Sequence, residues 1–250
     1  MRRMGEMAYN LRNGPDENRC AMELSQHPLF KNLTPEAATE AQKWAQMGYH
    51  PRGEFLFHAG DIAENIYLLL DGIVKVSYFN PGGDEKIISL AQTGDIFGEL
   101  FLGSYPHRIG TAYTLTPAVT ARLTRANLFQ MIQRSPQVGL NLVGHLADEQ
   151  RETLARLHAL MHVDARHRLL GTLLSVGRRF CCLDAEWLEL PTSITQQDLA
   201  NLACLNRSTV NIYINELRSQ GVLGGRGRQL IMNRRVVEAL LLEAGLEILQ

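Results

Sequence analysis

The pattern of apolar residues changes near residue 125, and this change limits the architectures that the chain can adopt. Between about residues 50 and 124, short apolar runs alternate with turn residues such as Asp71-Gly72. The runs that predict β-strands are 54–58, 66–70, 72–79, 86–90 and 118–123. Many short strands separated by turns are typical of an antiparallel barrel or roll. In front of them, residues 34–46 predict a helix with Thr34 as its N-cap.

After this region the periodicity is that of helices. A segment from Pro136 to about Val163 places apolar and polar residues at alternating spacings of three and four. These residues are Val143, Leu146, Gln150, Thr153, Leu157 and Leu160. Such a seam predicts a long helix that pairs with a second copy of the chain, and the alternative is a helix lying on its own domain. A further helix, 165–180, follows Asp164 as its N-cap.

Residues 194–223 predict two short helices joined by a tight turn. Thr195 caps the first helix, Asn206 caps the second, and Gly221 ends the second where a left-handed residue is expected. Residues 223–232 follow as a β-hairpin wing. Two helices in this order form a helix-turn-helix, whose second helix enters the major groove of DNA by its N-terminal end.

The same stretch is the basic part of a near-neutral chain. The formal net charge of the whole chain is −1, but residues 192–235 hold six arginines against Asp198 and Glu216. Arginine can form two hydrogen bonds with guanine and asparagine two with adenine, while helix N-termini bind phosphate. The alternative is an ordinary helical pair with a solvated arginine face. The predicted DNA-binding residues are Thr195, Gln196, Asn206, Arg207, Ser208, Asn211, Arg226 and Arg228.

Composition and motifs disfavour several other classes of protein. No uncharged apolar run approaches the roughly 20 residues of a membrane helix, and the N-terminus lacks the apolar stretch of a secretory signal. The four cysteines show no C-x-x-C spacing and do not form a disulfide framework. The sequence has no nucleophile elbow, H-E-x-x-H motif or Walker loop. These observations predict a soluble cytoplasmic protein that is not an enzyme.

The order and spacing of the segments resemble the CRP/FNR family of bacterial transcription regulators. The resemblance covers residues 27–233 and includes HPLFKNLTPEA, HAGDIAENIYLLLDGIVKV, GDIFGELFLGSYPHRIGTA, DARHRLLGTLLSV and the helix-turn-helix stretch. It implies an α+β fold with an N-terminal antiparallel β-roll like a cyclic-nucleotide-binding domain, a long dimerisation helix and a C-terminal winged helix-turn-helix. The expected boundaries are a flexible tail at 1–26, an effector-binding roll at 27–135, the dimerisation helix at 136–163, the winged domain at 164–236 and a C-terminal helix at 237–250.

The resemblance also implies a homodimer that binds a palindromic operator under the control of a small effector, with RNA polymerase as a further partner. The effector-binding residues that it assigns are Gly98, Glu99, Leu100, Arg108, Ile109, Thr153 and Leu154. In such a site the arginine pairs with a phosphate and the glutamate accepts from a ribose hydroxyl. Members that bind cyclic AMP carry hydroxyl groups where this chain has Ile109 and Leu154. We therefore expect no standard cyclic-AMP site: the effector is another small molecule, such as an anion paired to Arg108, or the regulator needs no ligand.

Other effectors and partners remain as alternatives. An iron–sulfur cluster takes four thiolates, and Cys20 is the only N-terminal cysteine, so this type of sensor is excluded. His107 offers a haem ligand. The thiols available to a redox switch are Cys181, Cys182 and Cys204. A C-terminal domain that binds protein in place of DNA is a further alternative.

In the second helix, Ser208 and Ile212 replace an acid and an arginine of the best-known member, which implies a different DNA consensus.

Overall fold

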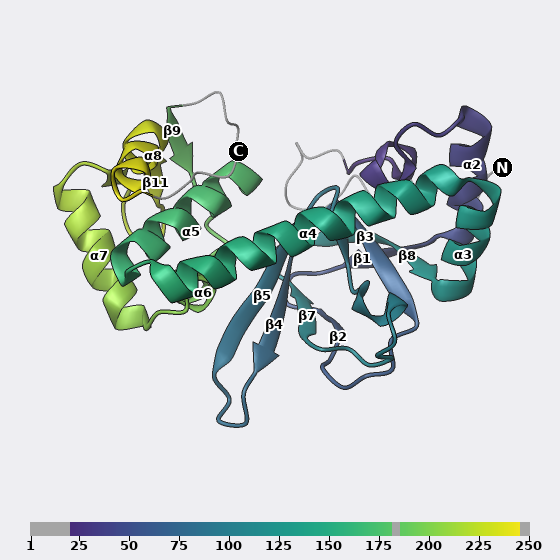
Figure 1. Cartoon of the computed structure of the whole chain (residues 1–250), viewed down its shortest axis with the longest axis horizontal. Coiled ribbons are helices and arrows are strands. Elements are labelled where there is room, and N and C mark those ends of the chain that lie inside the picture. Colours follow the sequence, from purple (N-terminus) through teal and green to yellow (C-terminus); the bar gives the residue numbers. More distant parts are fainter. Residues whose placement is uncertain (1–20, 182–185, 246–250) are drawn as a thin grey trace.

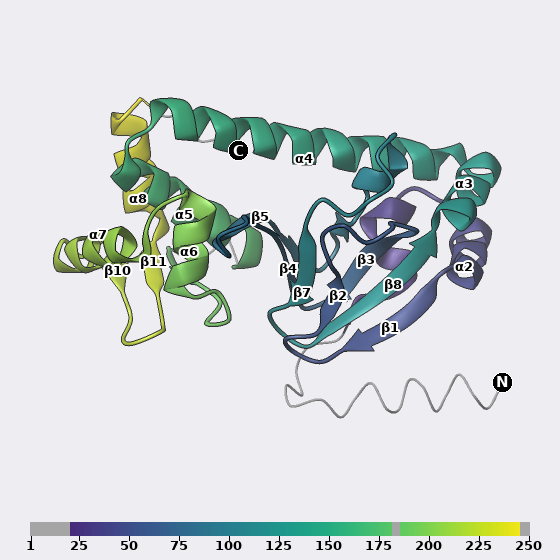
Figure 2. The same cartoon turned by 90° about the horizontal axis from the view of Figure 1, so that it is seen from below.

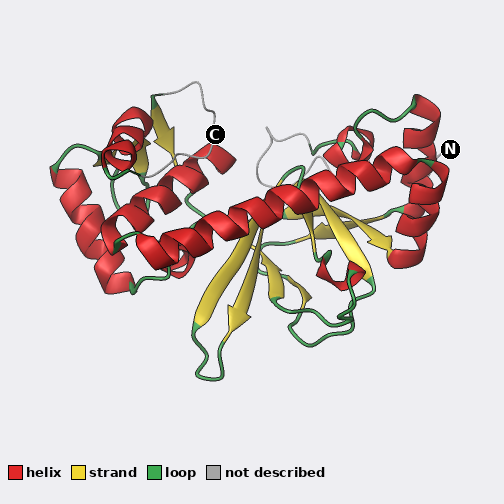
Figure 3. Ribbon diagram, viewed as in Figure 1, coloured by secondary structure: helices red, strands yellow, loops and turns green. Residues whose placement is uncertain are grey.

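One long helix joins two lobes of the molecule. The computed structural model describes residues 21–181 and 186–245 of the 250-residue chain. Helix α4 (Pro136–His162) carries the strand-rich lobe along its N-terminal part and the helical lobe beyond its C-terminal part (Figures 1 and 3). Both lobes lie on the same side of α4 (Figure 2). The predicted fold class, a β-roll followed by a long helix and a winged helix-turn-helix, is confirmed.

Two four-stranded antiparallel sheets form the first lobe, in the orders β1-β8-β3-β6 and β2-β7-β4-β5. The strands are β1 (Gln46–His50), β2 (Phe55–Phe57), β3 (Asn65–Asp71), β4 (Ile73–Phe79), β5 (Glu85–Gln92), β6 (Ile96–Phe97), β7 (Thr111–Thr114) and β8 (Ala118–Thr124). Strand β3 is buried on both faces: Ile66 and Leu68 enter one apolar cluster, and Tyr67 and Leu69 enter another. Because successive side chains of a strand point to opposite faces, β3 connects the two halves of the core.

Three strands and one α-helix of this lobe were not predicted from the sequence, namely β1, β6, β7 and the helix that follows β8. Helix α2 (Pro35–Trp44) ends before residue 46, and β1 begins there and pairs with β8. Helix α3 (Arg125–Arg134) follows β8 and is capped by Thr124, whose hydroxyl accepts from Asn127 N at 3.1 Å. Strand β1 is largely exposed, so it lacks the apolar alternation by which a strand is recognised.

The predicted tail at 1–26 is wrong for its last residues. Met22 N donates to Leu70 O at 2.9 Å, and Leu24 is only 8% exposed. Two short 3-10 helices, η1 (Leu24–Gln26) and η2 (Pro28–Phe30), cover the roll at this point. The first 20 residues of the predicted tail lie outside the described residues.

The second lobe packs four helices against a small sheet of order β10-β11-β9. Its elements are α5 (Ala165–Phe180), β9 (Trp187–Glu189), α6 (Gln196–Ala203), α7 (Arg207–Ser219), β10 (Leu223–Gly224), β11 (Ile231–Asn233) and α8 (Arg234–Glu243). Strand β9 adds a third strand to the predicted hairpin, with Leu188 paired to Met232. Helix α8 begins at Arg234 and not at residue 237, because the side chain of Asn233 caps it by accepting from Val236 N at 3.1 Å.

The two lobes also touch each other directly. Helix α6 packs on β5, and Ile73, Ile87 and Leu90 of the roll belong to the same buried cluster as the core of the helical lobe. Within this contact, Lys75 Nζ lies 2.6 Å from the Asp198 carboxylate. The fold therefore holds the helix-turn-helix against the roll as well as on the end of α4.

Candidate functional site

The first helix of the helix-turn-helix begins with a capping box. Asp198 N donates to Thr195 Oγ1 at 3.2 Å, and Thr195 N donates to the Asp198 carboxylate at 2.8 Å. Each side chain thus satisfies a backbone N–H group at the start of α6. The predicted cap at Thr195 is confirmed, and Gln196 is the first residue of the helix.

A left-handed residue makes the turn between the two helices. Cys204 ends α6 with φ +52°, and Leu205 N donates back to Ala200 O at 2.9 Å. Asn206 occupies the N-cap position of α7, but its side chain makes no capping hydrogen bond, so the predicted side-chain cap is wrong. The Asn206 amide is instead exposed beside the N-terminal end of α7.

Helix α7 separates an inward apolar face from an outward polar face. Val210, Ile214 and Leu217 are each 0% exposed and hold the helix in the core. The predicted base-reading residues Arg207, Ser208 and Asn211 are all exposed on the other side. The sequence therefore orients α7 by its apolar period and leaves its first two turns available to a groove.

Helix α7 ends as the sequence predicts. Gly221 has φ +72°, and the N–H group of Val222 donates to Leu217 O at 2.9 Å. This is the Schellman arrangement, for which a left-handed glycine is favoured. The chain then enters β10 and β11, and Arg226 and Arg228 are exposed in the turn that joins these strands.

A cavity of about 330 Å³ lies between the roll and α4. Six of the seven predicted effector-binding residues line it. These are Gly98, Glu99, Leu100, Arg108, Ile109 and Thr153. Besides Gln150, which also borders the exposed face of α4, three cavity residues on this helix were not predicted from the sequence, namely Leu146, Glu149 and Arg156. Together with Thr153 they are spaced by three, four and three residues, which places all four on the face of α4 toward the roll.

Arg108 is built into the wall of this cavity. Its guanidinium donates to Gly98 O at 2.5 Å and to Asn65 O at 2.6 Å, and its carbon lies 4.2 Å from the centre of the Phe57 ring. The residue is only 7% exposed. Gly98, with φ +76°, leaves the room that the guanidinium needs, because a Cβ there would lie 2.7 Å from Arg108 Nη1.

Carboxyl groups also face the cavity. Burial raises the pKa of Glu99 above its usual range, and burial likewise raises the pKa of Glu149. The neighbouring Arg179 is already engaged, with its guanidinium 2.6 Å from the Asp95 carboxylate and 3.0 Å from that of Glu152. The cavity therefore offers hydrogen-bond acceptors beside cations that have protein partners.

The other residues considered for effector chemistry have ordinary partners. His107 Nδ1 lies 3.1 Å from Gly60 O. Burial raises the pKa of the Cys181 thiol, which disfavours a reactive thiolate, and Cys204 is exposed. Cys20 and Cys182 lie outside the described residues. Across residues 21–181 and 186–245, no group of three His, Cys, Asp or Glu side chains is arranged to hold a metal ion, and no helix is both long and apolar enough to span a membrane.

Comparison with known proteins assigns both lobes to families. Residues 49–135 match the family model of the cyclic nucleotide-binding domain, and residues 167–240 match that of the Crp-like helix-turn-helix domain. The chain is 31% identical over 196 residues to the cyclic AMP receptor protein of Thermus thermophilus, covering 78% of this chain and 88% of that protein. The chain belongs to the CRP/FNR family. It is accordingly a DNA-binding transcription regulator with a cyclic-nucleotide-binding-like domain and a helix-turn-helix domain.

Two further comparisons agree with this assignment. The CRP-like cAMP-activated global transcriptional regulator of Mycobacterium tuberculosis is 26% identical over 210 residues, which cover 84% of this chain and 94% of that regulator. The solved structure of FixK2 from Bradyrhizobium japonicum superposes with a TM-score of 0.69 at 25% identity, over 78% of this chain and 96% of that one.

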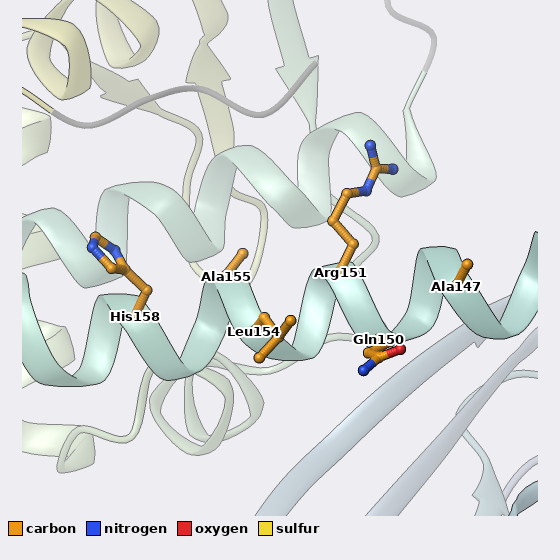
Figure 4. A pocket seen from close by; sticks show the side chains of 6 residues that line it. All are labelled: Ala147, Gln150, Arg151, Leu154, Ala155 and His158. Carbon is orange, nitrogen blue, oxygen red and sulfur yellow. The ribbon is translucent and has the colours of Figure 1, made fainter.

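One predicted effector residue of this CRP/FNR member, Leu154, does not line the cavity. It is 56% exposed and lies on another face of α4, beside Gln150 and His158 (Figure 4). The exposed apolar residues of this face are Leu140, Val143, Leu154, Leu157 and Met161. With Ala147 and Gln150 they repeat at spacings of three and four residues, which is the pattern of a coiled-coil seam.

Proposed function

We propose that two copies of the chain pair along the exposed face of α4 and bind a palindromic operator, with one α7 in each half-site. The supporting observation is the largely apolar seam from Leu140 to Met161, with Gln150 at its middle, which a single chain leaves open to water. A two-fold dimer presents two identical recognition helices, so the operator has matching symmetry. The regulator acts in the cytoplasm, and RNA polymerase is the further partner through which it changes transcription.

The DNA contacts divide by chemistry. Arg207, Ser208 and Asn211 contact base edges from the exposed start of α7. The phosphate contacts come from Thr195, Gln196, Asn206, Arg226 and Arg228. Phosphate contacts release counterions, so binding to any duplex weakens steeply as salt is raised.

The Arg207→Ala change tests this interface. We expect it to weaken binding to the operator by about 1–3 kcal/mol per half-site and to relax the preference for one guanine. Fluorescence anisotropy with operator and random duplexes measures both effects. Arg52→Ala removes the same charge from an exposed turn of the roll and is the matched control. Equal losses on operator and random DNA would mean that Arg207 contacts only phosphate.

We also propose that the cavity takes a small-molecule effector other than cyclic AMP. The supporting observation is Arg108, whose guanidinium already donates to two backbone carbonyls, those of Gly98 and Asn65. The exposed side chain that follows it, Ile109, offers no hydroxyl to a phosphate. Without that hydroxyl, one phosphate oxygen of a cyclic nucleotide would lack a hydrogen-bond donor in the cavity, which costs binding free energy.

A thermal-shift titration tests the effector proposal. Saturation at 100 times the dissociation constant stabilises a folded protein by about 2.7 kcal/mol, so a true ligand raises the melting temperature measurably. We expect no shift with cyclic AMP or cyclic GMP and a shift with a member of a panel of small acids. Ile109→Ser, which restores a hydroxyl, is the companion variant. A clear shift of the unaltered protein with cyclic AMP contradicts the proposal, and no shift with any compound favours a ligand-independent regulator.

A further inference from the structure

The outward face of α7 carries one large apolar side chain among polar ones. Ile212 is 64% exposed. Its neighbours on this face, Ser208, Asn211 and Asn215, are exposed as well. Ile212 is absent from the buried cluster of this lobe and from the half-buried residues packed against that cluster. A β-branched residue is also a poorer helix former than alanine, so the fold of α7 does not explain an isoleucine at this position.

Helix geometry places Ile212 within the surface that faces the groove. It follows Ser208 by four residues, and at 3.6 residues per turn the two side chains point within about 40° of each other. It follows Arg207 by five residues, or about 7.5 Å along the helix axis. Since successive bases of one strand are about 3.4 Å apart, this displacement corresponds to about two base steps.

We propose that Ile212 reads the methyl group of a thymine, about two base pairs from the guanine contacted by Arg207. This inference rests on the proposed docking of α7 in the major groove. Among the four standard bases only thymine presents a methyl group there, and the others present donors or acceptors alone. The side chain of isoleucine has no hydrogen-bonding group, so it makes a favourable apolar contact with the methyl group of thymine. If it covers a donor or acceptor of another base, that group loses its hydrogen-bond partner, which costs free energy.

The chemistry gives this contact a measurable size. Burial of one methyl group contributes about a fourfold gain in affinity. A dimer on a symmetric operator makes the contact twice, so the removal of both thymine methyl groups weakens binding about 15-fold. A thymine-to-deoxyuridine replacement removes only the methyl group and keeps every hydrogen bond of the base pair.

The experiment uses the full chain at low salt. Selection from random duplexes first defines the operator, and each thymine of both half-sites is then replaced by deoxyuridine in turn. We expect one symmetric thymine pair whose replacement weakens binding about 15-fold, and we expect Ile212→Ala to bind the thymine and deoxyuridine duplexes equally. Leu242→Ala is the matched control, because Leu242 is 60% exposed on α8; it should keep the full dependence on the methyl group.

The outcomes separate this inference from the proposed function. If Ile212→Ala retains the methyl dependence, or loses affinity equally on operator and random DNA, Ile212 does not read thymine while the DNA-binding role stands. If the full chain binds no duplex, or binds with no dependence on salt, the docking of α7 is overturned and the role of Ile212 falls with it. Loss of the methyl dependence in Ile212→Ala alone supports the inference.

Discussion

His27 is a buried imidazole with both ring nitrogens engaged. Nδ1 accepts from Leu29 N at 3.2 Å, so the proton is on Nε2, which donates to Asp95 O at 3.2 Å. The ring is 0% exposed, and burial lowers the pKa of His27 to about 4 from 6.5, although its contacts with Asp95 act in the opposite direction. His27 is therefore neutral in the folded protein near pH 7 and holds the N-terminal segment against the loop before β6.

Acidification should remove the stability that neutral His27 provides. Because the folded-state pKa of about 4 lies below 6.5, the unfolded chain binds the proton first as the pH falls. The stability that neutral His27 provides is present above pH 6.5 and is lost as the pH falls from 6.5 to 4. Between pH 7 and pH 5, the free energy of unfolding should fall by about 2 kcal/mol from this residue. Urea unfolding at both pH values measures it. His27→Asn keeps an acceptor for Leu29 N and should lose most of this dependence; an unchanged dependence would contradict the assignment.

The backbone of Cys204 is strained in the turn between α6 and α7. Its φ of +52° is left-handed, which costs an L-residue about 1 kcal/mol and glycine almost nothing. We expect Cys204→Gly to raise the free energy of unfolding by about 0.5 kcal/mol, since the greater freedom of glycine in the unfolded chain offsets part of the gain. Cys204→Ala removes the thiol but keeps the strain and should give no gain. Thermal unfolding of both variants tests this, and a larger gain from alanine would attribute the effect to the thiol.

At the scale of the element, α4 shows what the sequence predicts and what it leaves undecided. The alternation of three and four residues predicts the helix and a seam, because both follow from its own period. The period alone does not decide between neighbouring stripes. The predicted seam included Leu146 and Thr153, whereas the roll covers that side and both residues line the cavity. The open stripe instead runs through Leu154 and Met161.

The two stripes of α4 make different predictions for dimerisation. A glutamate at Leu154 would put a charge into the open stripe. Because the change removes two buried leucine side chains per dimer, one from each copy, we expect Leu154→Glu to raise the dimer dissociation constant at least about 100-fold. Leu160, which belongs to the stripe predicted from sequence, is 43% exposed at the edge of the open one. Leu160→Glu should therefore weaken the dimer much less. Sedimentation equilibrium measures both, and the reverse order would mean that the dimer uses the stripe predicted from sequence.

At the scale of the whole molecule, the contact between the lobes is the feature that the sequence least reveals. Lys75 and Asp198 lie 123 positions apart in the sequence. Nothing in the sequence around either residue distinguishes it from an ordinary charged residue on the surface. Local caps and periods fix the elements on either side, including the Thr195–Asp198 box and the strands of the roll. The pairing between distant elements depends on tertiary packing, which no local pattern records. The cavity residues on α4 other than Thr153 were missed for the same reason.

The contact is centred on a buried cation between two carboxylates. Lys75 is 3% exposed, with Nζ 2.9 Å from Glu85 and 2.6 Å from Asp198. Burial alone would lower the pKa of Lys75, but its hydrogen bonds to Asp198, Tyr113 and Glu85 raise it above the usual value, so the amine stays charged. The amide of Asn201 on α6 donates to Glu85 at 3.1 Å and closes the same contact.

Removal of that cation should separate the lobes. Lys75→Met leaves Glu85 and Asp198 facing each other without a counter-charge, and breaking a buried pair in this way costs about 3–5 kcal/mol. We expect calorimetry to split one unfolding transition into two, because the helical lobe then unfolds without the roll. Lys86→Met on the neighbouring strand β5 removes an exposed charge and is the control. Adding Glu85→Gln and Asp198→Asn to Lys75→Met removes the repulsion and should restore much of the loss. A single transition that Lys75→Met leaves unchanged would show that the apolar contact of Ile73, Ile87 and Leu90 holds the lobes together by itself.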